Sequence, residues 1–360
     1  MPPKYPKVGN LAPGREPRKL FNRRQLLAQM AIGAAGGLWA GTTRSSQFMG
    51  PYGAGFWPDP AQDQPILPST RWLGYHSPNL TPYVDDLPIL PRRPLGGQLV
   101  AAEHVHQFHR ELPRVRSWGF DGVSHFGPVL EVNKGEDTVT NFANELGEHI
   151  ISEFIDLTLH GVKPEDKTRP PMVIHLHGAP NRPGEDGYPT SPIRPGQSHD
   201  YRFSNAAEAA TLWYHDHSMG LTRLNICAGL AAPYWIRDEF DTGRDGNPLG
   251  LPAGEYEVPL LIADRVFYPD GRPRYDSLLV PILGHRWGGG LSGDVIVVNG
   301  KAWPKLDVNR GVYRFRLTSG SQLNDYRISL SNGMPLWVIG SDGGLLDAPV
   351  QVAALDLSAG

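Results

Sequence analysis

Two short segments, VIHLHG at residues 173–178 and LWYHDH at residues 212–217, decide how the rest of this chain is interpreted. Each carries a His-x-His pair framed by residues that favour β-strands. In a strand, residues i and i+2 point to one face and lie about 6.6–7 Å apart, whereas two imidazole nitrogens on one copper or zinc ion lie only about 3–4 Å apart. Each pair therefore suits two neighbouring metal ions better than one, and two facing strands could hold a metal cluster.

Histidine pairs also occur without metal. A single His-x-His pair is more simply explained as two core or surface side chains without a metal. Two such pairs, both within apolar strand segments, favour a metal site instead. A zinc hydrolase of the His-x-His-x-Asp-His type lacks its aspartate here, because Ala179 and Met219 stand at the matching positions. Gly178 lets the backbone turn away and leaves room over the site. A third pair, His104 and His106, has charged neighbours and predicts an exposed edge rather than a ligand set.

Composition narrows the class of protein. The 360 residues carry a formal charge of −3, with 34 Lys and Arg against 37 Asp and Glu, which argues against nucleic-acid binding by bulk charge. Gly (42) and Pro (35) predict many turns and few long helices. Cys227 is the single cysteine, so no intrachain disulfide and no four-thiolate metal site can form; we interpret it as a core side chain.

Short segments of period-two hydrophobicity, closed by turn residues, recur from Gly97 onward. They predict one set of strands at 98–108, 129–132, 137–144, 172–176, 199–203, 211–214 and 230–236. They predict a second set at 258–263, 294–299, 312–318, 326–330, 336–339 and 350–357. The spacing predicts an all-β antiparallel sandwich or barrel in each set. We expect domain 1 over 98–240, a charged Gly/Pro-rich linker over 241–257, and a truncated domain 2 over 258–360.

The first 45 residues are similar to a twin-arginine export signal. Basic residues crowd the segment 1–24, which ends in Arg23-Arg24, and an uncharged Ala/Gly-rich stretch follows that is too short for a comfortable membrane span. This predicts an exported protein, periplasmic or extracellular, that meets the twin-arginine machinery and has no stable membrane anchor. A basic tail before an ordinary helix is the alternative, since no clean Ala-x-Ala cleavage site follows. Residues 46–97 are predicted to be a Pro/Gly-rich arm or linker.

The histidine segments carry a family resemblance. HLHG (175–178), WYHDH (213–217) and LTRLNICAGL (221–230) resemble the first two copper motifs of three-domain bacterial multicopper oxidases, the group of spore-coat laccase, bilirubin oxidase and phenoxazinone synthase. Further matches are HQFHRELP (106–113), DGYP (186–189), VPLLIADR (258–265), VNGKAWP (298–304) and IGSDGGLL (339–346). The resemblance covers about residues 98–360. It implies cupredoxin-like Greek-key β-sandwich domains, the second of them incomplete here.

The resemblance also implies a function. The family couples one-electron oxidation of phenols or similar aromatic reductants at a type 1 copper to four-electron reduction of dioxygen to water at a trinuclear cluster. By the motif, His175 would bind the type 2 copper, and His177, His215 and His217 the type 3 pair. Asp186 would be the catalytic acid that protonates bound oxygen, although its segment is equally good turn chemistry. Asp216 lies between two ligands on a strand and should face away from the metals.

The sequence departs from the family pattern as well. A type 1 site needs two His and a Cys thiolate, yet the His-Pro-x-His-x-His-Gly and His-Cys-His motifs are absent and Cys227 has no histidine neighbour. The chain would thus supply half of the trinuclear ligands and no type 1 copper. Three hypotheses follow: the N-terminal part of a laccase-like oxidase, a noncatalytic copper-binding cupredoxin fragment, or a nonfunctional remnant. Substrate identity, oligomeric state, signal cleavage and copper loading are not determined by these residues.

Overall fold

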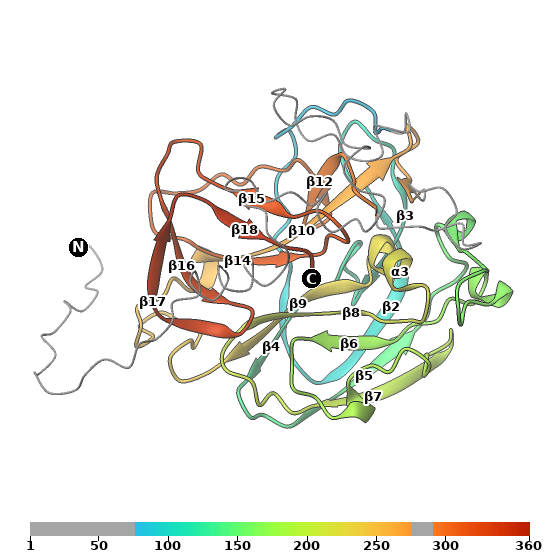
Figure 1. The fold of residues 1–360 in the computed structure, drawn as a ribbon, viewed down its shortest axis with the longest axis horizontal. Coiled ribbons are helices and arrows are strands. Elements are labelled where there is room, and N and C mark those ends of the chain that lie inside the picture. Colours follow the sequence, from blue (N-terminus) through green and yellow to red (C-terminus); the bar gives the residue numbers. More distant parts are fainter. Residues whose placement is uncertain (1–75, 276–290) are drawn as a thin grey trace, which may run out of the picture. The chain divides into compact units, whose positions relative to one another are not determined.

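The structure of the chain is a computed structural model, in which residues 76–275 and 291–360 are described (Figure 1). The predicted export signal and most of the predicted arm lie outside these residues. Within the described part of the chain, no helix is long and apolar enough to cross a membrane.

Two sheets facing each other form the first half of the fold (Figure 1). One sheet has the spatial order β1 (Arg92–Pro94), β4 (Val129–Asn133), β9 (Ala231–Arg237), β8 (Thr211–Asp216) and β6 (Ile174–His177). The other has the order β3 (Val115–Phe120), β2 (Gly97–His106), β5 (Thr138–Asn144) and β7 (Gln197–Phe203). Buried apolar side chains of both sheets meet between them, including Leu99 and Phe142 from one and Leu130 and Tyr214 from the other.

The second half begins with β10 (Glu257–Phe267), the longest described strand. It pairs in parallel with β14 (Arg314–Ser319) and antiparallel with β11 (Pro273–Arg274) and β12 (Val295–Val298), and β13 (Lys301–Ala302) extends the sheet beyond β12. Two antiparallel strand pairs follow, β15 (Tyr326–Ile328) with β18 (Leu355–Leu357) and β16 (Leu336–Ser341) with β17 (Gly344–Val352). The predicted domain boundary at 241–257 stays a prediction.

The all-β sandwich is confirmed, but its strand pairing differs from the expectation. The sheets are mixed rather than purely antiparallel, because β1–β4, β4–β9 and β2–β5 pair in parallel. Parallel neighbours need a crossover connection, and here the chain crosses between the two sheets of the sandwich. The pattern also missed β3, in which Arg116 and Gly119 interrupt the apolar alternation around the fully buried Trp118 and Phe120.

Helical segments are short. The one described α-helix is α3 (Thr222–Ala228), which ends at Gly229 with φ of +127°. The described 3-10 turns are η2 (Ser152–Phe154), η3 (Pro164–Lys167), η4 (Pro183–Glu185) and η5 (Gly254–Tyr256). The expectation of few long helices is therefore confirmed for the described residues.

The third histidine pair does not lie on an exposed edge, so this prediction was wrong. β2 is an inner strand, hydrogen-bonded to both β3 and β5. The His106 imidazole is buried, with Nε2 2.6 Å from the Gly300 carbonyl oxygen and Nδ1 2.8 Å from the Ser124 hydroxyl. The charged neighbours gave the misleading signal: Glu103 lies on the opposite face of β2 from His106, because side chains alternate along a strand, and Arg110 and Glu111 follow the end of the strand.

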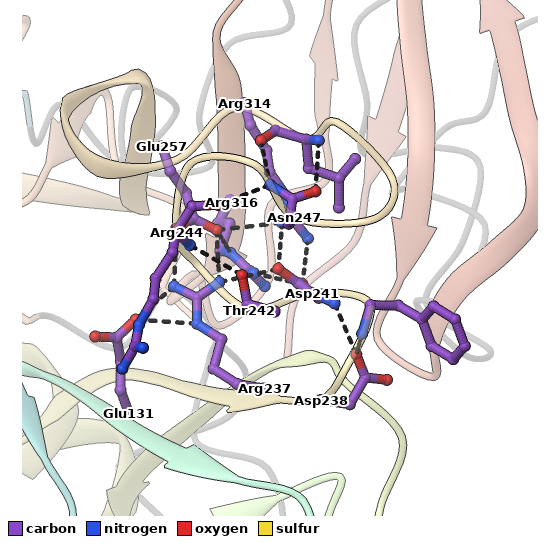
Figure 2. A network of polar contacts seen from close by, with 12 residues as sticks. Glu131, Arg237, Asp238, Asp241, Thr242, Arg244, Asn247, Glu257, Arg314 and Arg316 are labelled. Atoms are coloured by element: carbon purple, nitrogen blue, oxygen red, sulfur yellow. Dashed lines mark hydrogen bonds and ion pairs between the residues drawn. The ribbon is translucent and has the colours of Figure 1, made fainter. Parts of the chain in front are cut away.

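A buried ion network joins the end of β9 to the starts of β10 and β14 (Figure 2). The Arg237 guanidinium lies 2.8 Å from Glu257 and 3.1 Å from Asp241. Arg314 donates two hydrogen bonds of 2.7 Å to Asp241, and Arg316 donates to both Asp241 and Glu257 at 2.7 Å. The side chains of all five residues are at most 7% exposed. The network thereby fixes β10 and β14 relative to the histidine-bearing sheet.

Candidate metal centre

The two predicted His-x-His segments are neighbours at the edge of one sheet. β6 pairs antiparallel with β8, so that His175 stands opposite His215 and His177 opposite Trp213. Ile174 and Leu176 on β6 point into the sandwich core, where both are fully buried. Because side chains alternate along a strand, His175, His177 and His215 lie together on the outer face.

The imidazole rings come close enough to share metal ions. One ligand nitrogen from each of His175, His177 and His215 lies within 4.8 Å of the others, and His177 Nδ1 is 3.3 Å from His215 Nε2. The ring of His217, which follows β8 directly, lies 5.0 Å from that of His175 between centroids. The structure therefore brings all four predicted ligands together.

Backbone carbonyl groups orient two of these rings. His175 Nδ1 lies 2.6 Å from the Asp186 carbonyl oxygen, and His215 Nδ1 lies 2.7 Å from the Asp216 carbonyl oxygen. A ring that donates its Nδ1–H to a carbonyl keeps the lone pair of Nε2 free for a metal. His217 Nδ1 is buried and has no hydrogen-bond partner among the described residues. The cluster thus offers nitrogen atoms that protein groups leave unsatisfied.

Burial favours the neutral, metal-binding form of three of the rings, those of His177, His215 and His217. It lowers the pKa of His215 to about 3, assisted by the positive charge that the neighbouring rings would carry. Burial is also the main cause that lowers the pKa of His177 and of His217. Because a metal competes with protons for imidazole nitrogen, the cluster is ready for a cation at neutral pH.

Asp186 lies beside His175, at the end of η4. Gly187 follows with φ of +79°, and a Cβ atom there would lie 2.3 Å from the Ile174 carbonyl oxygen, so only glycine permits this close approach to β6. The turn thereby places the Asp186 carbonyl on His175 and one Asp186 carboxylate oxygen 3.5 Å from His175 Nδ1. The Asp186 side chain is 46% exposed. Asp186 therefore lies in a turn and also beside the histidine cluster, so its position agrees with both interpretations of this residue.

The Asp216 side chain faces away from the histidine cluster, as predicted. Its carboxylate accepts hydrogen bonds from the Val173 amide at 2.9 Å and from the amide and hydroxyl groups of Ser218. Burial raises the pKa of Asp216 to about 6, against the opposing effect of these hydrogen bonds. Asp216 thus ties the start of β6 to the end of β8 beneath the histidines.

Sequence reasoning missed the aromatic side chain next to the cluster. The Trp213 ring lies 4.2 Å from the His215 ring and 5.5 Å from the His177 ring between centroids. The hydrophobic pattern marks it only as an apolar strand residue, although its place two residues before His215 puts it on the histidine face. Gly178 has φ of +89°, in agreement with the predicted turn. Cys227 is buried in the core, as expected.

Two facing sheets with crossing connections and an outer-face cluster of four histidines define a cupredoxin-like sandwich with a candidate metal centre. A multicopper oxidase family model matches residues 165–241, the stretch that contains all four histidines. The chain belongs to the multicopper oxidase family.

Known relatives agree with this assignment. The chain is 37% identical over 289 residues to a laccase of Bacillus subtilis, covering 72% of this chain and 52% of the relative. It is 36% identical over 309 residues to a laccase of Bacillus stratosphericus, covering 76% of this chain and 56% of the relative. The McoA multicopper oxidase 2F4 variant of Aquifex aeolicus aligns with a TM-score of 0.61 and 27% identity, over 76% of this chain and 55% of that chain. The chain spans about half the length of these relatives.

Copper is the metal that the family implies, and the residues present fit it. Imidazole nitrogen suits copper, the buried His217 Nδ1 lacks a protein partner among the described residues, and His175 and His215 are held so that Nε2 is free. The described cluster contains neither the thiolate nor the His–Cys combination of a blue copper site.

Proposed function

We propose that this chain supplies part of the oxygen-reducing copper centre of a laccase-like multicopper oxidase. His175 would hold a type 2 copper, and His177, His215 and His217 would bind a type 3 pair. The observation that carries this proposal is the set of three ligand nitrogens within 4.8 Å of one another on one sheet face. Such spacing matches neighbouring metal ions rather than ordinary core packing.

Bound copper would supply one-electron redox chemistry, with dioxygen as the electron acceptor and a small phenolic or similar aromatic reductant as the donor. The protein groups would supply orientation and protons. The Asp186 carbonyl fixes the His175 tautomer at Nδ1, and the half-exposed Asp186 carboxylate lies 3.5 Å from that ring, where it can relay protons between solvent and the site. We therefore propose Asp186 as the proton donor.

This role of Asp186 can be tested in a complete oxidase that carries these residues, such as a chimaera with the C-terminal part of the Bacillus subtilis laccase. D186N should lower the rate of dioxygen consumption by about 10²–10⁴-fold at unchanged copper content, the range for a lost general acid. H177A should abolish dioxygen consumption together with type 3 copper. An H177A variant with full activity would contradict the ligand assignment, and a D186N variant with full activity would contradict the proton-donor assignment.

We also propose that the protein is exported, to the periplasm or the outside of the cell, through the twin-arginine machinery. The support is the Arg23-Arg24 pair before the Ala/Gly-rich stretch. Residues 1–45 fused to a folded reporter should direct the reporter out of the cytoplasm, and replacing both arginines by lysine should stop this. Export of the double-lysine variant at the original rate would overturn the proposal.

A further inference from the structure

Each imidazole of the metal centre needs a support that sets its orientation, and the supports differ. His175 and His215 each have a backbone carbonyl at Nδ1. The His177 ring has no such partner: in the described part of the chain its one polar contact is the 3.3 Å approach of Nδ1 to His215 Nε2, a pair of atoms that both suit a metal. A ligand histidine normally donates its second nitrogen to a carboxylate, carbonyl or water. Another support must therefore hold the His177 ring.

Trp213 is placed to provide that support. It stands opposite His177 in the β6–β8 register, and the two rings stack with an interplanar angle of 25° and 5.5 Å between centroids. The same indole lies 4.2 Å from the His215 ring at an angle of 35°. Trp213 is only 7% exposed, so the indole has little freedom to move. Aromatic pairs at such distances contribute measurable orientation energy beyond burial.

The indole lies in a buried apolar cluster to which both halves of the fold contribute. Trp213 belongs to this cluster together with Trp235 of β9 and with Leu261 and Ala263 of β10. The strand that carries Trp213 is also tied to the second half, because Arg316 of β14, a member of the ion network in Figure 2, donates a 2.7 Å hydrogen bond to Thr211, the first residue of β8. Burial and this hydrogen bond limit how far the indole can move.

From these contacts we infer that Trp213 is a positioning residue of the metal centre: its indole sets the orientation of the His177 and His215 imidazoles for copper. This inference rests on the proposed function, since it assumes that these rings bind copper. It extends that function by assigning a part in shaping the metal site to a residue that is not itself a ligand.

The test uses the 360-residue chain and Cu²⁺ as the probe, with the dissociation constant measured by chelator competition and the ligand field by electron paramagnetic resonance. W213L removes the aromatic face and should weaken Cu²⁺ binding about tenfold, the lower end for loss of a residue that orients a ligand, with altered copper hyperfine splitting. W213F keeps an aromatic ring and should bind within about threefold of wild type. W235L is the matched control, because Trp235 is buried in the same cluster and is not in ring contact with a histidine among the described residues.

W213L binding Cu²⁺ with wild-type affinity and spectrum would overturn the inference, as would W235L losing as much affinity as W213L. If W213L does not fold, W213M decides instead, because methionine keeps a flexible apolar side chain in the cluster but has no aromatic face. W213M should bind Cu²⁺ about tenfold more weakly than W213F; equal affinities of these two variants would overturn the inference. A wild-type chain that binds no Cu²⁺ would instead overturn the proposed metal centre, and this inference with it.

Discussion

Two polar clusters border the sheet that contains β6, β8 and β9, and they differ in how their polar groups are satisfied. In the ion network at the end of β9, every guanidinium of Arg237, Arg314 and Arg316 faces a carboxylate. In the histidine cluster on β6 and β8, burial lowers the pKa of His177, His215 and His217, and the buried His217 Nδ1 has no partner in the described protein. Buried polar groups are normally satisfied. In the network each charge is matched by the protein itself, whereas the proposed copper would complete the histidine cluster.

The pKa values show the same contrast. Burial alone would raise the pKa of Glu257, but hydrogen bonds and charges from Arg237 and Arg316 outweigh it and lower the pKa to about 2. The same balance, with Arg314 and Arg316 as the main partners, lowers the pKa of Asp241. The network therefore stays charged, while burial without an opposite charge keeps the pKa of His215 at about 3 and the ring neutral.

The largest expected effect comes from breaking the network. E257A leaves the buried guanidinium groups of Arg237 and Arg316 short of a counter-charge, which should lower the free energy of unfolding by about 3–5 kcal/mol, measured by urea denaturation. The control is E103A, which removes the partner of the partly exposed Arg116 and should cost less than about 1 kcal/mol. Equal losses in the two variants would show that the network does not stabilise the fold.

The next effect distinguishes buried histidines elsewhere in the fold from the ion network by the pH at which each one lowers the free energy of unfolding. Burial lowers the pKa of His106 and His149 to about 4. Between pH 6.5 and 4 these two histidines are therefore protonated in the unfolded chain but mostly neutral in the native chain. Stability should therefore fall as the pH drops through this window, by about 1.4 kcal/mol per pH unit for each such histidine.

The ion network responds in a lower pH range. Its carboxylates have lowered pKa values, so their contribution is present above the pKa of the unfolded chain, near 4.5 for Glu257, and is lost only as the pH falls towards 2. H149Q should thus flatten the decline in the free energy of unfolding between pH 6.5 and 4.5. An unchanged slope in H149Q would contradict the assignment of acid sensitivity to buried histidines.

A smaller effect is expected from removing a candidate ligand. Without metal, H177A removes a half-buried ring whose one polar contact in the described structure is the 3.3 Å approach to His215 Nε2, so the free energy of unfolding should fall by about 1 kcal/mol, the contribution of one hydrogen bond. Thermal denaturation of metal-free protein would measure it. A loss as large as that of E257A would mean that the histidines hold the fold together as the network does.

The smallest effect is expected at the surface. Arg327 and Asp356 form an ion pair of 3.2 Å between β15 and β18, with side chains 68% and 52% exposed. R327A should change the free energy of unfolding by less than about 0.5 kcal/mol, measured in the same urea series. A loss of several kcal/mol would show that burial does not explain the difference between the network and ordinary ion pairs.

The histidine cluster could be predicted from the sequence, whereas the ion network could not. The pairs that begin at His175 and His215 are recognisable because the period of a strand places both members of a pair on one face, and most of the strands were predicted from the same local alternation. Asp241 and Glu257 fell within the predicted linker, and their partners Arg314 and Arg316 lie more than 50 residues further along the chain. Ion pairs between distant segments leave no local periodicity, and neither does the stacking of Trp213 on His177.

The most direct test of the central claim is X-ray absorption at the copper edge of the 360-residue chain loaded with copper. The account predicts imidazole nitrogen ligands at about 2.0 Å in the wild-type chain, and loss of bound copper in H215A although that variant remains folded. Copper held only by oxygen ligands, or a spectrum and copper content unchanged by H215A, would contradict the claim that these histidines are a copper centre.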